Sequence, residues 1–444
     1  MVKAGKKVVV EIKANISGGA TAGTHQIDVN TANDVTGTGQ TTKNQVVEVI
    51  SSATANTVTV GAAGGTVEVS LASDSKTAQL FAGGTTVELA AFKFYATSTE
   101  DVELDYLYLT QAVVDAASSS YKDYDEIWFE NSSGVEIGGT RMSPTSTKPL
   151  VDFTENAFVV KTADTGGDIL YLKAKLAAIG TGFNGASAHR LGYKINAQAN
   201  VVAKGDLSGS GSTEYLSTSA APTGYTMYVF KAYPVFKKVS VDDTKLTNGT
   251  RDLFKFTITA VNDDIALDAF TFTISTTTAY ISADTCYLYD VTNVNNELQV
   301  NETGGCSGTN TAGTGVTSTF FTTGVMLQLA GFVDNWDTSY SADEITVSKN
   351  QPRTFVLRGD ATGVTTGASF GTAIAGDAAN LDGLTGMGSN ATSTTVIAYK
   401  ALHNDFIWSD KSNGAHSVST GDWVNGYLVS GLSSTTSTQQ TIAY

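Results

Sequence analysis

Apolar and polar residues alternate along most of this chain, which is the pattern of half-buried β-strands. The alternation is clear in TVEVSL (66–71), ILYLKAKL (169–176) and LFKFTITAV (253–261), and stretches rich in Gly, Asn, Asp, Ser and Thr separate such runs. Helical spacing is nearly absent, apart from a short helical turn expected within 115–124. The pattern therefore predicts an all-β chain of tandem antiparallel β-sandwich modules of the immunoglobulin-like kind.

Two pairs of segments repeat the same order of elements. Residues 66–110 and 235–275 each contain a strand, an Asp-containing loop, a Gly turn, a strand with F-K-F, an acidic corner and an aromatic strand. Residues 169–205 and 354–383 share a strand, a small-residue turn and a second strand of small residues. These pairs predict the first and second halves of two homologous modules.

The opening segment has the shape of a second half without a first. We therefore predict an incomplete module at 1–60, complete modules at 61–230 and 231–400, and an extended tail at 401–444. Half a sandwich leaves an open strand edge and an unpaired apolar face. Either the chain is a piece of a longer repeat protein, or a neighbouring subunit supplies the missing strands. In the second case the tail is the candidate donor strand.

Composition favours a secreted β-protein. Of the 444 residues, 41% are hydrophobic and only 16% are charged, so Thr, Ser, Asn and Gly dominate the surface. Acidic residues outnumber basic ones by 43 to 27, and the formal charge of −16 repels phosphate and anionic lipid. Apolar runs stay below the roughly 18 residues that a membrane span needs. We expect no nucleic-acid partner and no membrane span.

The two cysteines, Cys286 and Cys306, lie close together in a segment rich in Gly, Asn and Thr. A disulfide formed in an oxidising compartment is the favoured interpretation, and closing this loop would stabilise the fold by about 3 kcal/mol. The alternative is two unpaired thiols.

The sequence contains no H-E-x-x-H and no Walker loop. We therefore do not expect an enzyme. The acids at the repeated turns are either solvated loop residues or calcium ligands at module ends, and no cofactor other than calcium is expected. These candidate ligands are Asp101, Asp105, Asp263, Asp264 and Asp268.

Five N-x-S/T sequons mark candidate glycosylation sites on surface loops or turns. Their acceptors are Asn15, Asn131, Asn248, Asn301 and Asn390.

The tail carries two tryptophans, each near an aspartate. An exposed Trp can stack on a sugar ring, but Trp is also a common interface anchor, and we favour the anchor role. The expected interface residues of the tail are Trp408, Trp423, Tyr427, Leu428, Ile442 and Tyr444.

Two motifs carry a resemblance to a known group of proteins. The run W-S-D-x-S…H-S-x-S-T-x-D-W-x-N-G-Y-L-V (408–429) resembles the ends of large, repetitive S-layer-like surface proteins of ultra-small candidate-phylum (Patescibacteria-type) bacteria. The pairing of V-x-V-D-D-x-x-L-x-N-G-T-x-D-L-F-K-F (239–256) with T-F-V-L-R-G-D-x-T-G (354–363) is similar to their repeated β-modules. The resemblance implies a cell-surface component and brings no catalytic residues.

These observations predict an extracellular or cell-surface structural protein that assembles with copies of itself into a surface layer or filament through strand edges. Two alternatives stay open. The first is an adhesin or carbohydrate-binding protein that uses Trp408 and Trp423 on cell-envelope or host glycans. The second is a viral or phage fibre or capsid protein.

Overall fold

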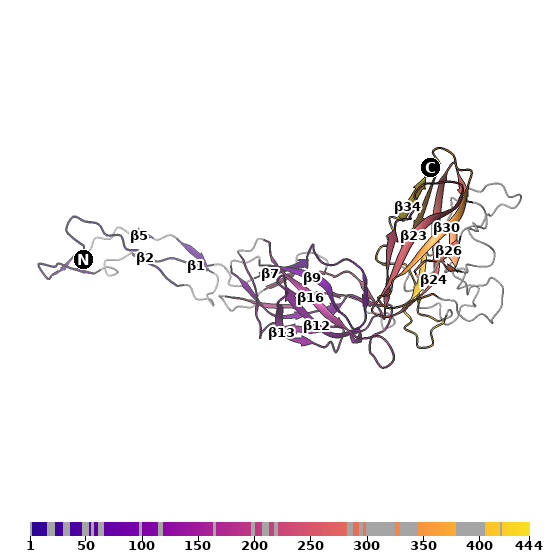
Figure 1. Ribbon diagram of the computed structural model, residues 1–444. Coiled ribbons are helices and arrows are strands. Elements are labelled where there is room, and N and C mark those ends of the chain that lie inside the picture. The colour runs from indigo at the N-terminus through magenta and orange to yellow at the C-terminus, as the bar shows by residue number, and fades with distance from the viewer. Residues whose placement is uncertain are drawn as a thin grey trace.

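The computed structural model describes a protein made almost entirely of β-strands (Figure 1). Its described residues are 2–15, 23–29, 36–46, 53–54, 57–60, 66–96, 100–113, 119–162, 166–196, 200–206, 213–216, 221–281, 287–292, 296–298, 325–328, 345–378, 405–417 and 420–444. A short 3-10 turn, η2 (Tyr121–Asp123), is capped by Ser120. The prediction of an all-β chain of tandem antiparallel sandwiches is confirmed.

The first sandwich runs from β7 to β21. Its strands are β7 (Thr66–Leu71), β8 (Leu80–Ala82), β9 (Thr86–Ala96), β10 (Val102–Tyr108), β11 (Thr110–Gln111), β12 (Tyr124–Asn131), β13 (Glu136–Met142), β14 (Leu150–Asp152), β15 (Phe158–Val160), β16 (Asp168–Leu176), β17 (His189–Leu191), β18 (Tyr193–Lys194), β19 (Val201–Gly205), β20 (Thr213–Leu216) and β21 (Met227–Phe230). One sheet has the order β13-β12-β16-β9-β7-β20, and in the other β10 pairs with β14, β15 and β19. Alternate residues of these strands meet in a buried core that includes Phe92, Phe129 and Leu172.

The second sandwich follows directly. Its strands are β22 (Tyr233–Val239), β23 (Gly249–Val261), β24 (Ile265–Thr277), β25 (Tyr280–Ile281), β26 (Tyr287–Asp290), β27 (Asn296–Leu298), β28 (Val325–Gln328), β29 (Ile345–Val347), β30 (Arg353–Thr362), β31 (Ser369–Ile374), β32 (Phe406–Ser409), β33 (Trp423–Asn425) and β34 (Thr438–Ala443). One sheet has the order β22-β23-β30-β26-β27, and in the other β24 pairs with β28, β29, β31 and β32. Phe256 lies at the centre of the core, with its ring 5.1 Å from that of Phe270 and 5.4 Å from that of Phe355.

The two sandwiches share one pairing scheme. In the first, β9 lies between β7 and β16, and in the second β23 lies between β22 and β30. Likewise β10 pairs with β14, β15 and β19, as β24 pairs with β28, β29 and β32. The strands of the two predicted first halves, and the opening strands β16 and β30 of the two second halves, therefore occupy equivalent places in the two units.

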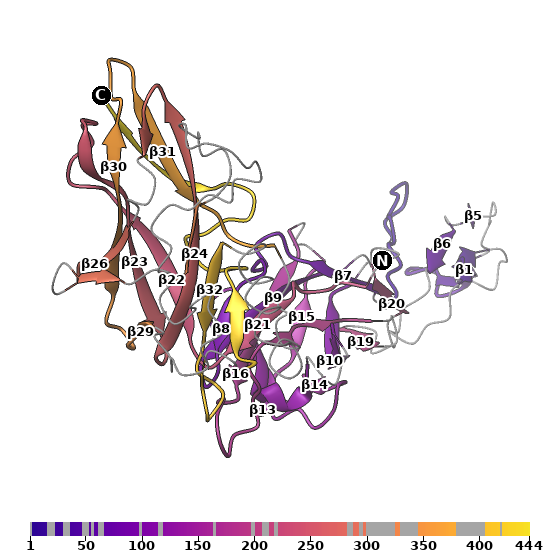
Figure 2. The same cartoon turned by 90° about the vertical axis from the view of Figure 1, so that its right-hand side faces the viewer.

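The segment before the first sandwich contains a long two-stranded ribbon. Three nested antiparallel pairs form it: β1 (Gly23–His25) with β6 (Val58–Val60), β2 (Asp28–Val29) with β5 (Ala53–Thr54), and β3 (Gly37–Thr38) with β4 (Gln45–Val46). At the tip the Gly39 N–H donates to the Asn44 carbonyl at 2.8 Å. The ribbon extends beyond the end of the first sandwich in both views (Figures 1 and 2). That residues 1–60 represent half of a module stays a prediction.

The C-terminal residues do not form a separate tail. They are extended, as expected, but β32 pairs with β24, β33 pairs with β32, and β34 pairs with β31 along six residues. The predicted boundary at residue 400 is therefore corrected, since these strands complete the second sandwich. The candidate donor strand is paired within its own chain because its alternate residues Gln440 and Ile442 are buried there.

Candidate functional site

A short joint connects the two sandwiches. Lys231 and Ala232 are the two residues between β21 and β22. The core of the second sandwich also includes Leu80, Ala188 and Phe230 from the first. The Phe230 ring lies 5.1 Å from the indole of Trp408, and both side chains are buried. The two units therefore meet through a continuous apolar contact.

A buried carboxylate lies at the centre of this joint. Asp410, directly after β32, is fully buried. Its Oδ2 accepts hydrogen bonds from the Ser187 hydroxyl and from the Lys231 backbone N–H, the latter at 2.8 Å, and its Oδ1 accepts from the Ser412 N–H at 3.1 Å. Burial raises the pKa of Asp410 above its usual value despite these donors. One side chain of the second sandwich thus holds a loop of the first sandwich and the connecting residue.

The opposite side of the joint is closed by Asn262, in the turn between β23 and β24. Its backbone has a φ of 80°, in the left-handed region that Asn tolerates better than most residues. Its Nδ2 donates to the carbonyl of Lys231 at 2.8 Å and to that of Gly83 at 3.2 Å. The Lys231 ammonium pairs with Asp263 at 2.9 Å. The connecting residue is therefore held through its N–H, its carbonyl and its side chain.

Gly83 fits where no larger residue would. Its N–H donates to the Phe230 carbonyl at 2.9 Å, which extends the parallel pairing of β8 with β21. A Cβ at this position would lie 2.9 Å from both the Ala177 carbonyl oxygen and the Ile179 Cγ1. The end of the first sandwich is therefore closely packed against the residues that lead into the second.

A second buried carboxylate organises the C-terminal strands. Asp377, after β31, accepts from the N–H groups of Asp405 at 2.6 Å, Phe406 at 3.3 Å and Gly426 at 2.6 Å. Burial outweighs these donors and raises the pKa of Asp377 to about 6. The side chain therefore joins the starts of β32 and of the turn after β33 to the end of β31.

Five of the six predicted tail residues pack against the chain itself, and one is exposed. Trp408 and Trp423 are 0% and 2% exposed, and their Nε1–H groups donate to the carbonyls of Asn425 and Ser417 at 2.9 Å each. Ile442 is buried, and Tyr427 and Leu428 pack against the second core, while the Tyr444 side chain is exposed. The suggested stacking of sugars on the two Trp rings is wrong, because neither ring is accessible.

His416 and Asp422 form a buried pair beside Trp423. The His416 Nδ1 lies 2.8 Å from the Asp422 carboxylate, and its ring lies 5.2 Å from the Trp423 indole. Burial alone would raise the pKa of Asp422, but hydrogen bonds from His416 and Thr420 and the His416 charge outweigh it and lower that pKa to about 2. The pair fixes the loop between β32 and β33.

The predicted turn acids lie in two separate places. Asp101 accepts from the Thr162 N–H at 2.8 Å and pairs with Lys161 at 3.0 Å, and Asp105 pairs with Lys204 at 3.0 Å. At the joint, Asp263 pairs with Lys231, and Asp264 accepts from the Lys349 N–H at 2.8 Å. Asp268 lies on β24, and its side chain is outside the described set. The described residues hold no group of three or more His, Cys, Asp or Glu arranged for a metal ion, and calcium binding stays a prediction.

The remaining predicted sites divide between described and undescribed residues. Asn15 is exposed. The Asn131 Oδ1 accepts from the N–H groups of Ser133 and Val135, and the Asn248 Oδ1 accepts from the Val364 N–H. Cys286, Cys306, Asn301 and Asn390 lie outside the described residues, so the disulfide and glycosylation stay predictions.

Sequence reasoning did not find the joint. Asp410 and Asn262 lie in runs of polar residues that resemble ordinary turns, W-S-D-K-S and V-N-D-D. The available signal was the position of Asp410 two residues after Trp408, because an aspartate that enters a core beside an anchoring Trp needs several donors.

The solved structures compared with this chain are distant in sequence and in fold. The sequence matches no protein-family model, and no curated relative matches it. A solved structure of CBD12 from CALX1.2 is 10% identical, covers 76% of this chain and 92% of its own, and has a TM-score of 0.26. The C-terminal domain of the Streptococcus agalactiae AgI/II polypeptide BspA is 9% identical over 70% of this chain and 94% of its own, with a TM-score of 0.16. The serine-rich repeat protein Srr2 of the same species is 11% identical over 70% and 87%, with a TM-score of 0.16. Similarity at these TM-scores carries no functional argument.

Proposed function

We propose that this chain is an extracellular structural protein whose copies assemble into a surface layer or filament through contacts between strand edges. The observation that carries the proposal is the joint between the sandwiches. Asp410, Asn262 and the Phe230–Trp408 contact hold two β-units together, an arrangement that serves shape and mechanical continuity. The proposal assigns the chain no catalytic role.

The composition further supports a role outside the cell. The surface is built from Thr, Ser, Asn and Gly, with 16% charged residues, as in many secreted β-proteins. In the part of the chain that the structure describes, no helix has the length and apolar character needed to cross a bilayer.

Electron microscopy of the purified protein tests the proposal together with sedimentation over a range of concentrations, with and without calcium. We expect sheets or fibres with a regular repeat, and a sedimentation coefficient that rises with concentration. Protein that stays monomeric under all of these conditions would overturn the proposal. Specific binding by that monomer on a glycan array would instead favour an adhesin that uses surfaces other than the two Trp rings.

A further inference from the structure

An apolar strand-forming segment precedes the ribbon. Residues 6–13 read K-K-V-V-V-E-I-K, and none of them belongs to a strand ladder. The exposed fractions of Val8, Val9, Val10 and Ile12 are 58%, 93%, 79% and 62%. β-Branched residues at successive positions favour an extended strand. An extended apolar segment of this kind is a ready partner for a sheet edge.

The ribbon that follows offers this segment no core. The hydrophobic residues that the structure describes as buried begin at Val67, in the first sandwich, so the described residues before it contribute none. An isolated two-stranded ribbon is marginally stable in water. The segment and the ribbon therefore gain stability only by contact with another surface.

The first sandwich has an opening of suitable shape on one lateral side. The edge strand β13 of one sheet faces the edge strand β14 of the other across this side. Asn156 closes the start of the opening, since its Nδ2 donates to the Glu136 carbonyl and its carbonyl accepts from the Gly138 N–H. Beyond it lies a groove of about 310 Å³ between residues 139–142 and β14. Apolar side chains line it from both sheets: Ile127, Ile137, Met142, Leu150 and Val151.

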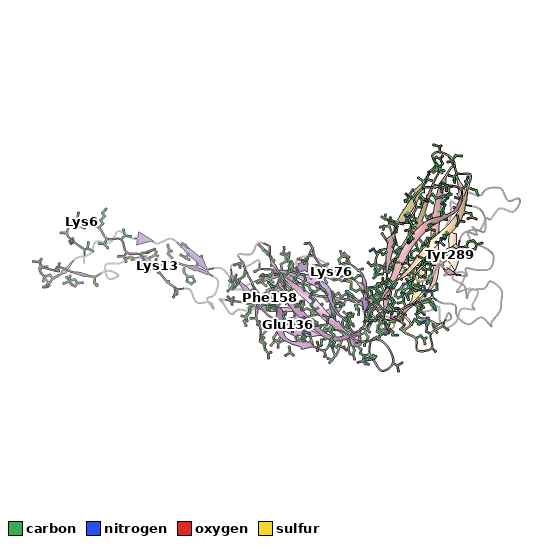
Figure 3. All side chains as sticks on the ribbon, in the orientation of Figure 1. Lys6, Lys13, Lys76, Glu136, Phe158 and Tyr289 are labelled. Atoms are coloured by element: carbon green, nitrogen blue, oxygen red, sulfur yellow. The ribbon has the colours of Figure 1, made fainter. Side chains whose placement is uncertain are left out.

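The charges of the segment and the groove are complementary. Residues 2–15 carry four lysines against one glutamate. Asp152 and Glu155 line the groove, and Glu126 and Glu136 flank its single cation, Arg141, at 3.7 and 3.1 Å. A basic segment on a chain of net charge −16 is therefore attracted to an acidic opening on another copy. Figure 3 shows Lys6 and Lys13 on the segment that precedes the ribbon, well apart from Glu136 on the first sandwich.

We propose that residues 6–13 of one copy add as a strand in the groove between β13 and β14 of a second copy. This inference deepens the proposed function and rests on it. Val8, Val10 and Ile12 share one face of an extended strand and fill the apolar floor, while Lys6 and Lys13 reach the acids at the two ends. Eight residues span about 26 Å, enough to follow the part of β13 beyond Asn156. The strand edge supplies main-chain hydrogen bonds and the groove supplies specificity.

Photo-crosslinking tests the contact directly. Benzoylphenylalanine replaces Val10 in an unlabelled copy of the protein. This variant is mixed with an excess of ¹⁵N-labelled wild type, and the mixture is allowed to assemble, irradiated and digested. We expect crosslinked peptides that join the segment to residues 136–155 of a labelled chain. Crosslinks confined to a single chain, or to residues elsewhere on the labelled chain, would overturn the proposal.

Matched variants test its energetic consequence by sedimentation. A variant that lacks residues 2–15 should not assemble under conditions in which wild type does. Reversing Lys6, Lys7 and Lys13 to Glu should weaken association by about tenfold. Leu150→Asp places a charge on the groove, at a residue 37% exposed, and should weaken association similarly. Phe183→Asp is the control, since Phe183 is 63% exposed on the same sandwich and does not line the groove.

The outcomes separate this inference from the proposed function. If wild type assembles and the deletion variant assembles equally well, the strand-addition contact is wrong and the structural role stands. If wild type itself never assembles, both fail. Circular dichroism of each variant must match wild type, and a folded Leu150→Asp variant that assembles normally would contradict the assignment of the groove.

Discussion

The carboxylate of Asp410, in the second sandwich, accepts a hydrogen bond at 2.8 Å from the backbone N–H of Lys231, the first residue after the first sandwich. The two residues are 179 positions apart in sequence. This contact joins the residue that follows β32 to the connection between the two units. The C-terminal part of the second sandwich is therefore held against the residues that lead into that sandwich.

Replacing Asp410 by Ala should strongly destabilise the protein. The N–H groups of Lys231 and Ser412 and the hydroxyl of Ser187 would lose their acceptor inside the joint, and we expect the free energy of unfolding to fall by about 2–4 kcal/mol. Urea denaturation measures the change. Asp243→Ala is the matched control, because its side chain is 65% exposed, and it should change stability by less than about 0.5 kcal/mol. Equal effects of the two variants would contradict the role of Asp410.

Phe230→Ala should loosen the joint. The buried ring contacts Trp408, and its loss leaves a cavity that costs about 3–5 kcal/mol. We expect faster tryptic cleavage after Lys231, detected by mass spectrometry, because the connection becomes accessible. The exposed Phe183 provides the comparison: Phe183→Ala should leave the cleavage rate unchanged. A Phe230→Ala variant that resists trypsin as wild type does would show that the ring does not hold the joint.

Asp377 should make the protein less stable as the pH rises. Its folded pKa of about 6 lies above the ordinary value of 3.8, because the site is buried. The folded state therefore holds the proton more tightly than the unfolded chain, and the contribution is present below about pH 4 and lost as the pH rises through 6. Two pKa units correspond to about 3 kcal/mol. The difference in unfolding free energy between wild type and Asp377→Asn should change by about that amount between pH 4 and 7, and a constant difference would refute the assignment.

Asp422 should make the protein less stable as the pH falls. Its folded pKa of about 2 lies below 3.8 because the hydrogen bonds from His416 and Thr420 outweigh its burial. Its contribution is therefore present above about pH 4 and lost as the pH falls toward 2. Thermal unfolding of wild type and Asp422→Asn should give melting temperatures that differ at pH 6 and converge near pH 2. A gap that persists at pH 2 would point to packing rather than to charge.

Peptide mapping without reductant tests the predicted disulfide. We expect a peptide pair linked through Cys286 and Cys306, and reduction should lower the free energy of unfolding by about 3 kcal/mol. Quantitative alkylation of both thiols in the unreduced, unfolded protein would show that they are unpaired.

Much of the architecture could be predicted from local patterns. The alternation in ILYLKAKL predicts a half-buried strand, and in β16 the residues Leu170, Leu172, Ala174 and Leu176 are all buried. The two pairs of repeated segments likewise predicted two units, because the same order of elements recurs along the chain.

The joint could not be predicted in the same way. The partners Ser187 and Asp410 lie 223 positions apart, and no local period encodes a contact at that distance. The same limit applies to the last strand: polar alternation predicts that 438–443 is extended, but only the position of β31 decides that it pairs within its own chain.

The short connection has a mechanical consequence. Only two residues connect β21 to β22, and hydrogen bonds hold both the N–H and the carbonyl of Lys231. The connection therefore has no loose segment that a pulling force could extend. Force applied to one sandwich is therefore passed directly to the next. In a polymer of such copies, the axial spacing would be set by the combined length of the paired sandwiches, and elasticity would come from the contacts between copies.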